Sequence, residues 1–205
     1  IRRPPRATLF PYTTLFRSYA FQTPDGRRGL KDVFDGRSQL IVVHFMMGPD
    51  WDEGCVSCSL MADHYNPAVP HLNARDVTLI AVSRAPLERI AGFKARMGWT
   101  FPWYSSEGSD FNFDFKVSFD QEEIDSGKVD YNYKRQSFSS TEAPGISVFA
   151  KDAKGQVCHT YSTFGRGLDM FIGAYHFLDI VPKGRDEAGF DYSMAWVRHH
   201  DRYDT

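Results

Sequence analysis

Two cysteines separated by two residues, Cys55 and Cys58, constrain the fold of this chain more than any other feature. They follow an apolar run, residues 40–47, and a turn, residues 48–54, that contains glycine, proline and acidic residues. The residues after them, 59–65, are typical of the beginning of a helix. A strand that leads through a turn to a C-x-x-C in the first turn of a helix is the arrangement of a thiol–disulfide redox site. Residues three apart share one helix face, so we expect the two sulfur atoms to meet.

Length and composition predict a chain that builds a core of its own. It has 205 residues, of which 42% are hydrophobic and 15% aromatic, so disulfide staples are not needed for folding. Three cysteines are too few, and odd in number, for a secreted disulfide framework. We therefore expect a reducing, cytoplasmic location, in which a C-x-x-C is a working thiol pair.

The charge balance argues against nucleic acid and membrane surfaces as partners. The chain has 24 basic and 26 acidic residues, which gives a formal net charge of −2. Its longest apolar run, residues 40–47, is far shorter than the roughly 20 residues of a membrane-spanning helix. We expect the partner to be a thiol or disulfide protein or a small thiol compound, and we leave open a homo-oligomer.

Residues 1–18 differ from the rest of the sequence. Residues 8–18 resemble one reading frame of a common sequencing adaptor, so we interpret residues 1–18 as an artefact and exclude them from fold reasoning. They contain four arginines and no acidic residue, so their removal leaves 20 of the 24 basic residues against 26 acidic ones. The native start, including any signal peptide, is then expected to be missing. A short basic targeting arm is the alternative.

The first half of the remaining sequence, which we interpret as a single domain over residues 19–205, predicts a parallel β-α-β unit. Residues 40–46 and 77–82 are apolar on both faces, apart from His44 and Thr78, as in strands of a sheet that is covered on both sides. We expect helices over residues 55–65 and 87–97. Strand, helix, strand and helix at this spacing indicate a right-handed parallel crossover.

The second half adds an insertion and a hairpin. Residues 100–141 are aromatic and then polar, so we expect an irregular insertion there. Strands at 145–149 and 156–161 and a helix at 168–178 follow. The assembled order predicts a thioredoxin-like α/β fold, with a mixed central sheet flanked by helices and an insertion before the third core strand. Pro144 precedes that strand, where this fold commonly has a cis proline, so we expect a cis bond rather than a plain turn proline.

Several short segments resemble one bacterial family. These segments are residues 44–46, 55–59, 83–86, 96–99, 102–106, 110–112, 159–161 and 196–201. Together they are similar to a thioredoxin-like domain-of-unknown-function family, family 899, which is sometimes labelled a predicted dithiol–disulfide oxidoreductase. The resemblance covers nearly everything from Tyr19 to Tyr203. It implies a thioredoxin-like fold and a thiol–disulfide exchange activity.

The match to well-understood enzymes of this fold is looser. Val56 and Ser57 separate the cysteines, where thioredoxin has Gly-Pro. A peroxiredoxin needs Pro-x-x-x-Thr-x-x-Cys, and counting back from Cys55 gives Asp52 at the threonine position and Gly48 at the proline position. A peroxide reductase is therefore retained only as an alternative function.

We predict that Cys55 is the attacking thiolate and that Cys58 resolves the mixed disulfide. The partial positive charge of a helix N-terminus favours the thiolate of Cys55. Three acids precede it, Asp50, Asp52 and Glu53, and nearby negative charge raises the pKa of a thiol. These two effects oppose each other, and the sequence does not rank them.

Three further residues have alternative interpretations. Trp51 either shields the thiols, contributes to a docking surface or simply packs. Arg84 follows the second strand and either steadies an anion or thiolate, or has a solvated or capping role. Cys158 lies on an expected strand and is predicted to be a buried, unreactive thiol.

Two other function classes remain open. A zinc module would use Cys55 and Cys58 with two histidines, although no second C-x-x-C or H-x-x-x-H supports it. The histidines considered are His64, His159, His199 and His200. A non-catalytic scaffold would use the aromatic residues 99–119 as its interface. No glycine-rich phosphate-binding motif follows a strand, so we expect no organic cofactor.

Overall fold

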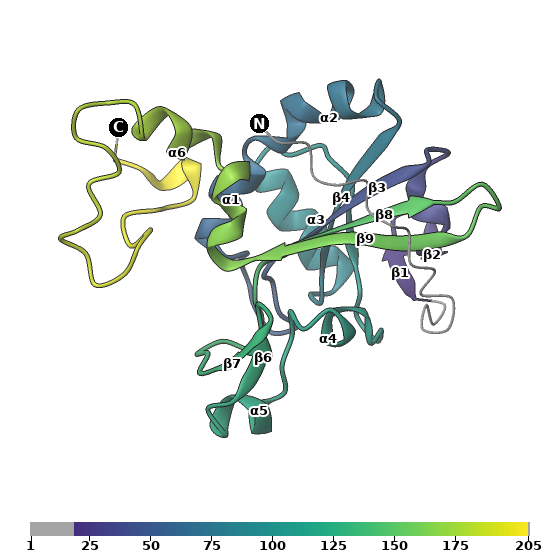
Figure 1. The fold of residues 1–205 in the computed structure, drawn as a ribbon, viewed down its shortest axis with the longest axis horizontal. Coiled ribbons are helices and arrows are strands. Elements are labelled where there is room, and N and C mark those ends of the chain that lie inside the picture. The colour runs from purple at the N-terminus through teal and green to yellow at the C-terminus, as the bar shows by residue number, and fades with distance from the viewer. Residues whose placement is uncertain (1–18, 205) are drawn as a thin grey trace.

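Seven strands form the central sheet in the computed structural model, which describes residues 19–204 (Figure 1). The strands are β1 (Ala20–Thr23), β2 (Gly26–Gly29), β3 (Gln39–His44), β4 (Val77–Ser83), β5 (Trp103–Ser105), β8 (Gly145–Lys151) and β9 (Val157–Phe164). Their order across the sheet is β2-β1-β5-β4-β3-β8-β9. Strands β3, β4 and β5 are parallel, whereas β1 pairs antiparallel with β5, and β8 pairs antiparallel with β3. The sheet is therefore mixed, as expected.

Helices cover both faces of this sheet. The α-helices are α1 (Val56–Ala62), α2 (Tyr65–Asn73), α3 (Leu87–Arg96), α4 (Phe111–Asp114), α5 (Gln121–Asp125) and α6 (Gly173–Leu178). The 3-10 helices are η1 (Asp32–Phe34), η2 (Gly165–Phe171) and η3 (His200–Arg202). Residues of α1, α2, α3 and α6 share one hydrophobic cluster, and η1 and the start of α4 contribute to another. The fold is thus an α/β sandwich of the expected kind.

Strand β3 shows why its sequence is apolar at nearly every position. Successive side chains of a strand point to opposite faces of the sheet. Val43 is fully buried in the cluster that includes Ile90 and Tyr175, whereas Val42 is fully buried in the cluster that includes Phe21. Burying such a side chain contributes roughly 1.5–3 kcal/mol relative to leaving it exposed. Two covered faces therefore need apolar side chains on both sides of the strand, as predicted.

The expected insertion over residues 100–141 is partly wrong. Strand β5 lies within that range and pairs with both β4 and β1 in the central sheet. Trp103 and Ser105 are buried there. Strand β5 has only three residues, and one of the buried ones is a serine. The alternation of apolar and polar residues is therefore too short to predict a strand from the sequence.

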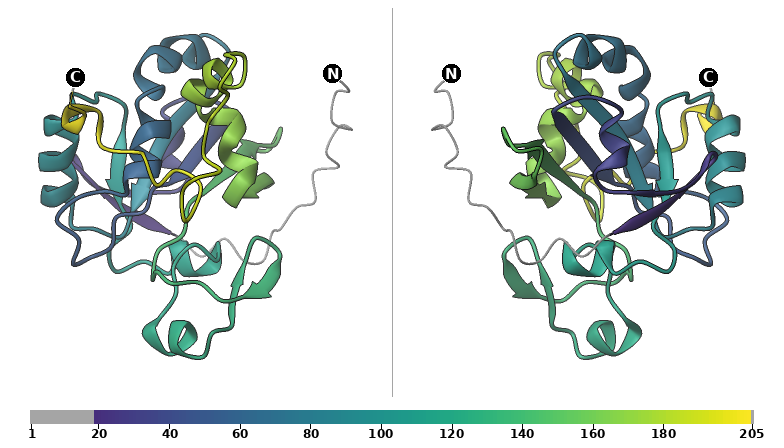
Figure 2. Two further views of the ribbon diagram at one scale, coloured as in Figure 1. Left: turned by 90° about the vertical axis from the view of Figure 1, so that its left-hand side faces the viewer. Right: turned by 90° about the vertical axis from the view of Figure 1, so that its right-hand side faces the viewer.

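The part of that segment from Val117 onward has its own small core. Strands β6 (Val129–Tyr131) and β7 (Lys134–Gln136) form a hairpin that lies with α5 outside the central sheet (Figures 1 and 2). Its core consists of Val117, Phe119, Val129, Tyr131, Ala143 and Phe164. Because Phe164 ends β9, this core attaches the insertion to the sheet.

The expected cis bond at Pro144 is absent, and the Ala143–Pro144 peptide bond is trans. The insertion holds this stretch in extended form. The Ala143 N–H donates to the Val117 carbonyl at 2.9 Å, and the Tyr131 hydroxyl donates to the Pro144 carbonyl at 2.7 Å. The chain therefore enters β8 through a trans bond, and the residues on both sides of that bond are hydrogen-bonded to the insertion.

Two expected helices also differ in detail. The cysteine helix stops at Ala62 and the chain resumes as α2 at Tyr65. The helix expected over residues 168–178 divides into η2 and α6, with Ile172 extended between them. After α6, residues 179–199 contain no helix or strand and form a long loop beside it (Figure 1).

Candidate active site

Cys55 is the N-cap residue of α1 and lies directly after the turn that leaves β3. Its backbone N–H donates to the Met46 carbonyl at 3.0 Å, which folds the turn back onto the strand. Gly54 precedes it in a tight space, because a Cβ there would lie 2.5 Å from the Phe45 ring and 2.8 Å from the Phe93 ring. Only a residue without a side chain fits between these two rings, and this close packing fixes the position of the cysteine that follows Gly54.

The two thiols differ in exposure and in acidity. Cys55 is partly exposed, and Cys58 is 2% exposed. The pKa of Cys55 falls to about 7, chiefly because the Cys58 thiol donates a hydrogen bond to its sulfur. Burial raises the pKa of Cys55, and hydrogen bonds from the backbone N–H groups of Cys58 and Ser57, at the helix start, lower it.

The pKa of Cys58 is raised well above that of an ordinary thiol. The largest cause is the hydrogen bond that its proton makes to Cys55. Burial and the negative charge of Cys55 raise it further, while the Met46 backbone lowers it. When one of the two thiols loses its proton near neutral pH, it is therefore Cys55, and Cys58 keeps its proton.

The acids before Cys55 do not reverse this order. Asp50 and Asp52 are exposed to solvent, which screens their charges. Glu53 forms ion pairs with Arg96, at 2.7 Å, and with Arg202. The competition that the sequence left open is thus decided for the thiolate.

A pocket of about 240 Å³ opens beside the two cysteines, and we call it the thiol pocket. Besides Cys55 and Cys58 it is lined by Met46, Ser57, Met61, Pro144, Gly165, Arg166, Leu168, Asp169, Ile172 and Met194. Its walls are mostly apolar, and Arg166 forms an ion pair with Asp169 at 2.6 Å. Sequence reasoning missed Arg166, Asp169 and Met194. They lie more than a hundred positions after the cysteines, and no motif marks them.

Of the three predicted neighbours, only Pro144 lines the thiol pocket. Trp51 and Arg84 line a different hollow of about 250 Å³. Trp51 packs over Gly48, where an added Cβ would lie 3.0 Å from the indole nitrogen. Arg84 pairs with the buried Glu142 at 3.5 Å and does not line the thiol pocket.

The histidines considered for zinc are engaged elsewhere. His64 accepts from the Ala174 N–H at 3.2 Å, and His159 bonds the Ser162 hydroxyl at 2.7 Å. His199 donates to the Gly54 carbonyl at 2.9 Å and belongs to a polar cluster with Arg96. Within residues 19–204, no group of three or more metal-ligating side chains could hold an ion.

The third cysteine lies apart from the dithiol. Cys158 is on β9 and is 2% exposed. The prediction that this thiol is buried is confirmed.

A mixed sheet between two helical layers, with strand β3 leading to a dithiol at a helix start, defines a thioredoxin-like α/β protein. The chain belongs to a bacterial protein family of unknown function, DUF899, whose sequence profile matches residues 5–203. The predicted family and fold are thereby confirmed. No curated protein sequence matches the chain.

Solved structures of peroxiredoxins are similar to this fold. A cysteine-to-serine mutant of peroxiredoxin Q from Xanthomonas campestris has a TM-score of 0.51 at 13% identity, over 83% of this chain and 98% of that one. Peroxidoxin BcpB from Mycobacterium tuberculosis has a TM-score of 0.51 at 12% identity, over 75% and 88%. At these identities the similarity shows the fold alone. No helix within residues 19–204 is long and apolar enough to cross a bilayer.

Proposed function

We propose that this protein is a thiol–disulfide oxidoreductase in which Cys55 attacks and Cys58 resolves. One observation carries the proposal. A partly exposed thiol with a pKa of about 7 lies against a buried thiol that keeps its proton. Cys55 is ionised enough to attack at neutral pH, and Cys58 lies next to it as the thiol that resolves the mixed disulfide.

The first half of the exchange forms a mixed disulfide. The Cys55 thiolate attacks one sulfur of a substrate disulfide, an S–S bond forms, and the other substrate sulfur leaves as a thiolate. In the second half, Cys58 loses its proton and attacks the sulfur of Cys55. The substrate departs as a second thiol, and the protein keeps a Cys55–Cys58 disulfide. Two electrons pass to the substrate, and an external thiol reductant must restore the dithiol.

The environment of Cys58 changes at the step where it must react. Two causes of its raised pKa, the hydrogen bond to Cys55 and the charge of Cys55, require that Cys55 be a thiolate. Both are lost once Cys55 is part of a mixed disulfide. Only burial then opposes ionisation of Cys58, so its proton is released after the first attack rather than before it.

The thiol pocket suits a partner with an apolar body. Its apolar lining comes from methionine, leucine, isoleucine and proline side chains, with the pair of Arg166 and Asp169 at its edge. A disulfide in a protein segment, or a small thiol compound, fits this chemistry. The low cysteine number favours a reducing location such as the cytoplasm, and we leave open a homo-oligomer.

The direct test is to trap the mixed disulfide. Cys58→Ser removes the resolving thiol, so incubation with oxidised glutathione should leave one glutathione attached at Cys55, measured by intact and peptide mass spectrometry. Cys55→Ser is the matched variant and should form no stable adduct at the dithiol. Equal glutathionylation of the two variants, or of Cys158 instead, would contradict the assignment.

Peroxide is a second candidate substrate because the solved structures of similar fold are peroxiredoxins. The sequence argues against a peroxide substrate, because Gly48 and Asp52 occupy the positions at which the peroxiredoxin motif has proline and threonine. Consumption of hydrogen peroxide and of a disulfide by the same reduced protein, compared at equal concentration, separates the two. A faster reaction with peroxide would replace disulfide exchange as the function.

A further inference from the structure

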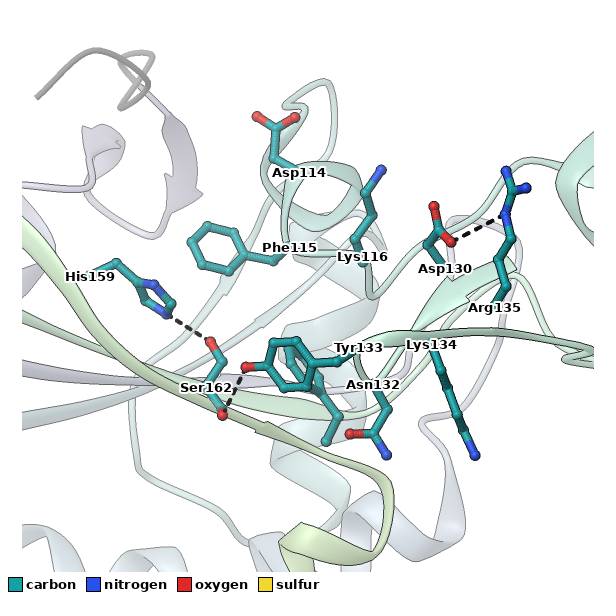
Figure 3. Close-up of a pocket in the computed structure, with 11 residues that line it drawn as sticks. Asp114, Phe115, Lys116, Asp130, Asn132, Tyr133, Lys134, Arg135, His159 and Ser162 are labelled. Carbon is teal, nitrogen blue, oxygen red and sulfur yellow. Dashed lines mark hydrogen bonds and ion pairs between the residues drawn. The ribbon is translucent and has the colours of Figure 1, made fainter. Parts of the chain in front are cut away.

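A second hollow in the described part of the chain is larger than the thiol pocket. A cavity of about 500 Å³ lies between residues 114–116, the β6–β7 hairpin and β9, and we call it the hairpin cavity (Figure 3). None of its lining residues lines the thiol pocket. Its volume lies in the range of small-molecule sites, roughly 300–1,000 Å³.

A bulge in β9 brings two polar side chains to the cavity floor. His159 and Ser162 are three residues apart, and in a regular strand they would point to opposite faces. The pairing of β9 with β8 shifts by one residue between Val148 and Phe149. The two side chains therefore point the same way, and their hydrogen bond is 2.7 Å long. Bulges commonly re-aim side chains in this manner near functional sites.

A buried hydrogen-bond chain supports this floor. The Ser162 hydroxyl lies 2.8 Å from the Ser147 hydroxyl, which lies 2.8 Å from Nε2 of the buried His44. Burial lowers the pKa of His159 and that of His44, so both rings are neutral at neutral pH. The floor is thus rigid, polar and uncharged.

Aromatic side chains form the walls above it. Tyr133 is 81% exposed, yet its hydroxyl donates to the Ser162 carbonyl at 3.2 Å and its ring lies 5.6 Å from that of Phe164. Tyr133 has a left-handed backbone, with φ of 62°, as have Asn132 and Lys116 on the same cavity. Such conformations are uncommon for residues other than glycine and concentrate at functional sites.

The rim carries more positive than negative charge. Lys116 and Lys134 form no ion pair within residues 19–204, and Arg135 approaches Asp130 at only 3.5 Å. The remaining acid, Asp114, accepts a hydrogen bond from the Tyr19 hydroxyl at 2.7 Å. The chain as a whole has a net charge of −2, so this local excess of cations is not a property of its surface in general.

We propose that the hairpin cavity binds a small aromatic carboxylate. Its ring would pack against Phe115, Tyr133 and His159, whose side chains all face the hollow in Figure 3. Its carboxylate would lie at the rim near Lys116 and Lys134. Aromatic walls and a cationic rim select a planar anion over an aliphatic or a neutral molecule.

Calorimetric titration with naphthoate and with its neutral isostere naphthamide tests this assignment. We expect naphthoate to bind and naphthamide to bind at least about tenfold more weakly, with the difference shrinking in high salt. Equal binding of the two molecules, or no binding of naphthoate, would overturn the proposal. This comparison needs no variant, so it stands even if a substitution disturbs folding.

Three substitutions locate the binding site. Lys134→Gln should weaken naphthoate about two- to fivefold by removing one rim charge, and leave naphthamide unchanged. Tyr133→Asn keeps a residue that tolerates the left-handed backbone and should weaken both molecules about tenfold. Lys154→Gln, in the turn between β8 and β9, is the control and should bind as the parent does. An equal loss in Lys154→Gln and Lys134→Gln would contradict the site.

Discussion

One proton shared between two sulfurs decides the chemistry of this chain at the scale of the residue. The Cys58 thiol gives its hydrogen bond to Cys55, and this contact lowers the pKa of Cys55 more than any other. The sequence predicted the pair and the sign of the helix effect. It could not rank that effect against three preceding acids. The ranking depends on exposure and on the ion pairs of Glu53, which involve residues more than 40 positions away.

We predict that Cys58→Ala raises the pKa of Cys55 from about 7 toward that of an ordinary thiol, because the largest lowering cause is removed. A rise of one unit would reduce the thiolate fraction at pH 7 from about one half to about one tenth. The rate of Cys55 alkylation by iodoacetamide, followed against pH, gives the midpoint. Cys158→Ala is the control and should keep the midpoint of the parent, whereas an unchanged midpoint in Cys58→Ala would refute the account.

At the scale of elements, the β6–β7 hairpin holds two walls of the thiol pocket in place. The Tyr131 hydroxyl donates to the Pro144 carbonyl at 2.7 Å and accepts from the Gly165 N–H at 2.9 Å. Pro144 and Gly165 both line the thiol pocket. The insertion, which the sequence left unstructured, therefore supports the site from behind.

Tyr131→Phe should destabilise the fold and weaken substrate binding together. It leaves the half-buried Pro144 carbonyl and Gly165 N–H without this partner, which costs at most about 1–3 kcal/mol of unfolding free energy. We expect a higher KM in disulfide exchange, with the alkylation midpoint of Cys55 unchanged. Denaturant unfolding and steady-state kinetics measure both. Tyr161→Phe, on the exposed side of β9, serves as the comparison, and a similar loss there would show that the hydroxyl contacts of Tyr131 are not the cause.

The elements that the sequence predicted are longer than those that it missed, and they depend less on contacts with distant parts of the chain. Strands β3 and β4 and helix α3 were predicted because each carries six or more residues of one clear pattern, an apolar run in the strands and a helical period in α3. Strand β5 has three residues and is fixed by pairing with two distant strands. The trans bond at Pro144 lies between two residues that are hydrogen-bonded to Val117 and Tyr131, and such tertiary contacts are not visible in the local sequence pattern.

At the scale of the whole molecule, one buried carboxyl couples stability to pH. Burial raises the pKa of Glu142 to about 7, although Ser118 and Arg84 both favour its ionised form. Between its ordinary pKa near 4.5 and about 7, the unfolded chain loses this proton and the folded chain keeps it. Stability should therefore fall as pH rises through that window and level off above it.

Glu142→Gln should remove this dependence. The variant has no proton to lose at this position. Between pH 4 and pH 8, its unfolding free energy should therefore rise relative to that of the parent, by at most about 3 kcal/mol. Urea unfolding of both proteins at several pH values measures the difference, and the values at pH 4 serve as the internal reference. A constant difference across this range would show that Glu142 titrates alike in the folded and unfolded chain.

The central claim is that Cys55 and Cys58 form one reversible redox unit. The most direct measurement equilibrates the folded protein in a series of glutathione redox buffers, alkylates the free thiols after unfolding, and counts them by mass spectrometry. We predict that Cys55 and Cys58 lose their labels together at one midpoint, while Cys158 stays labelled throughout. If both thiols stay labelled in every buffer, or if they lose their labels independently, the protein is not a dithiol oxidoreductase.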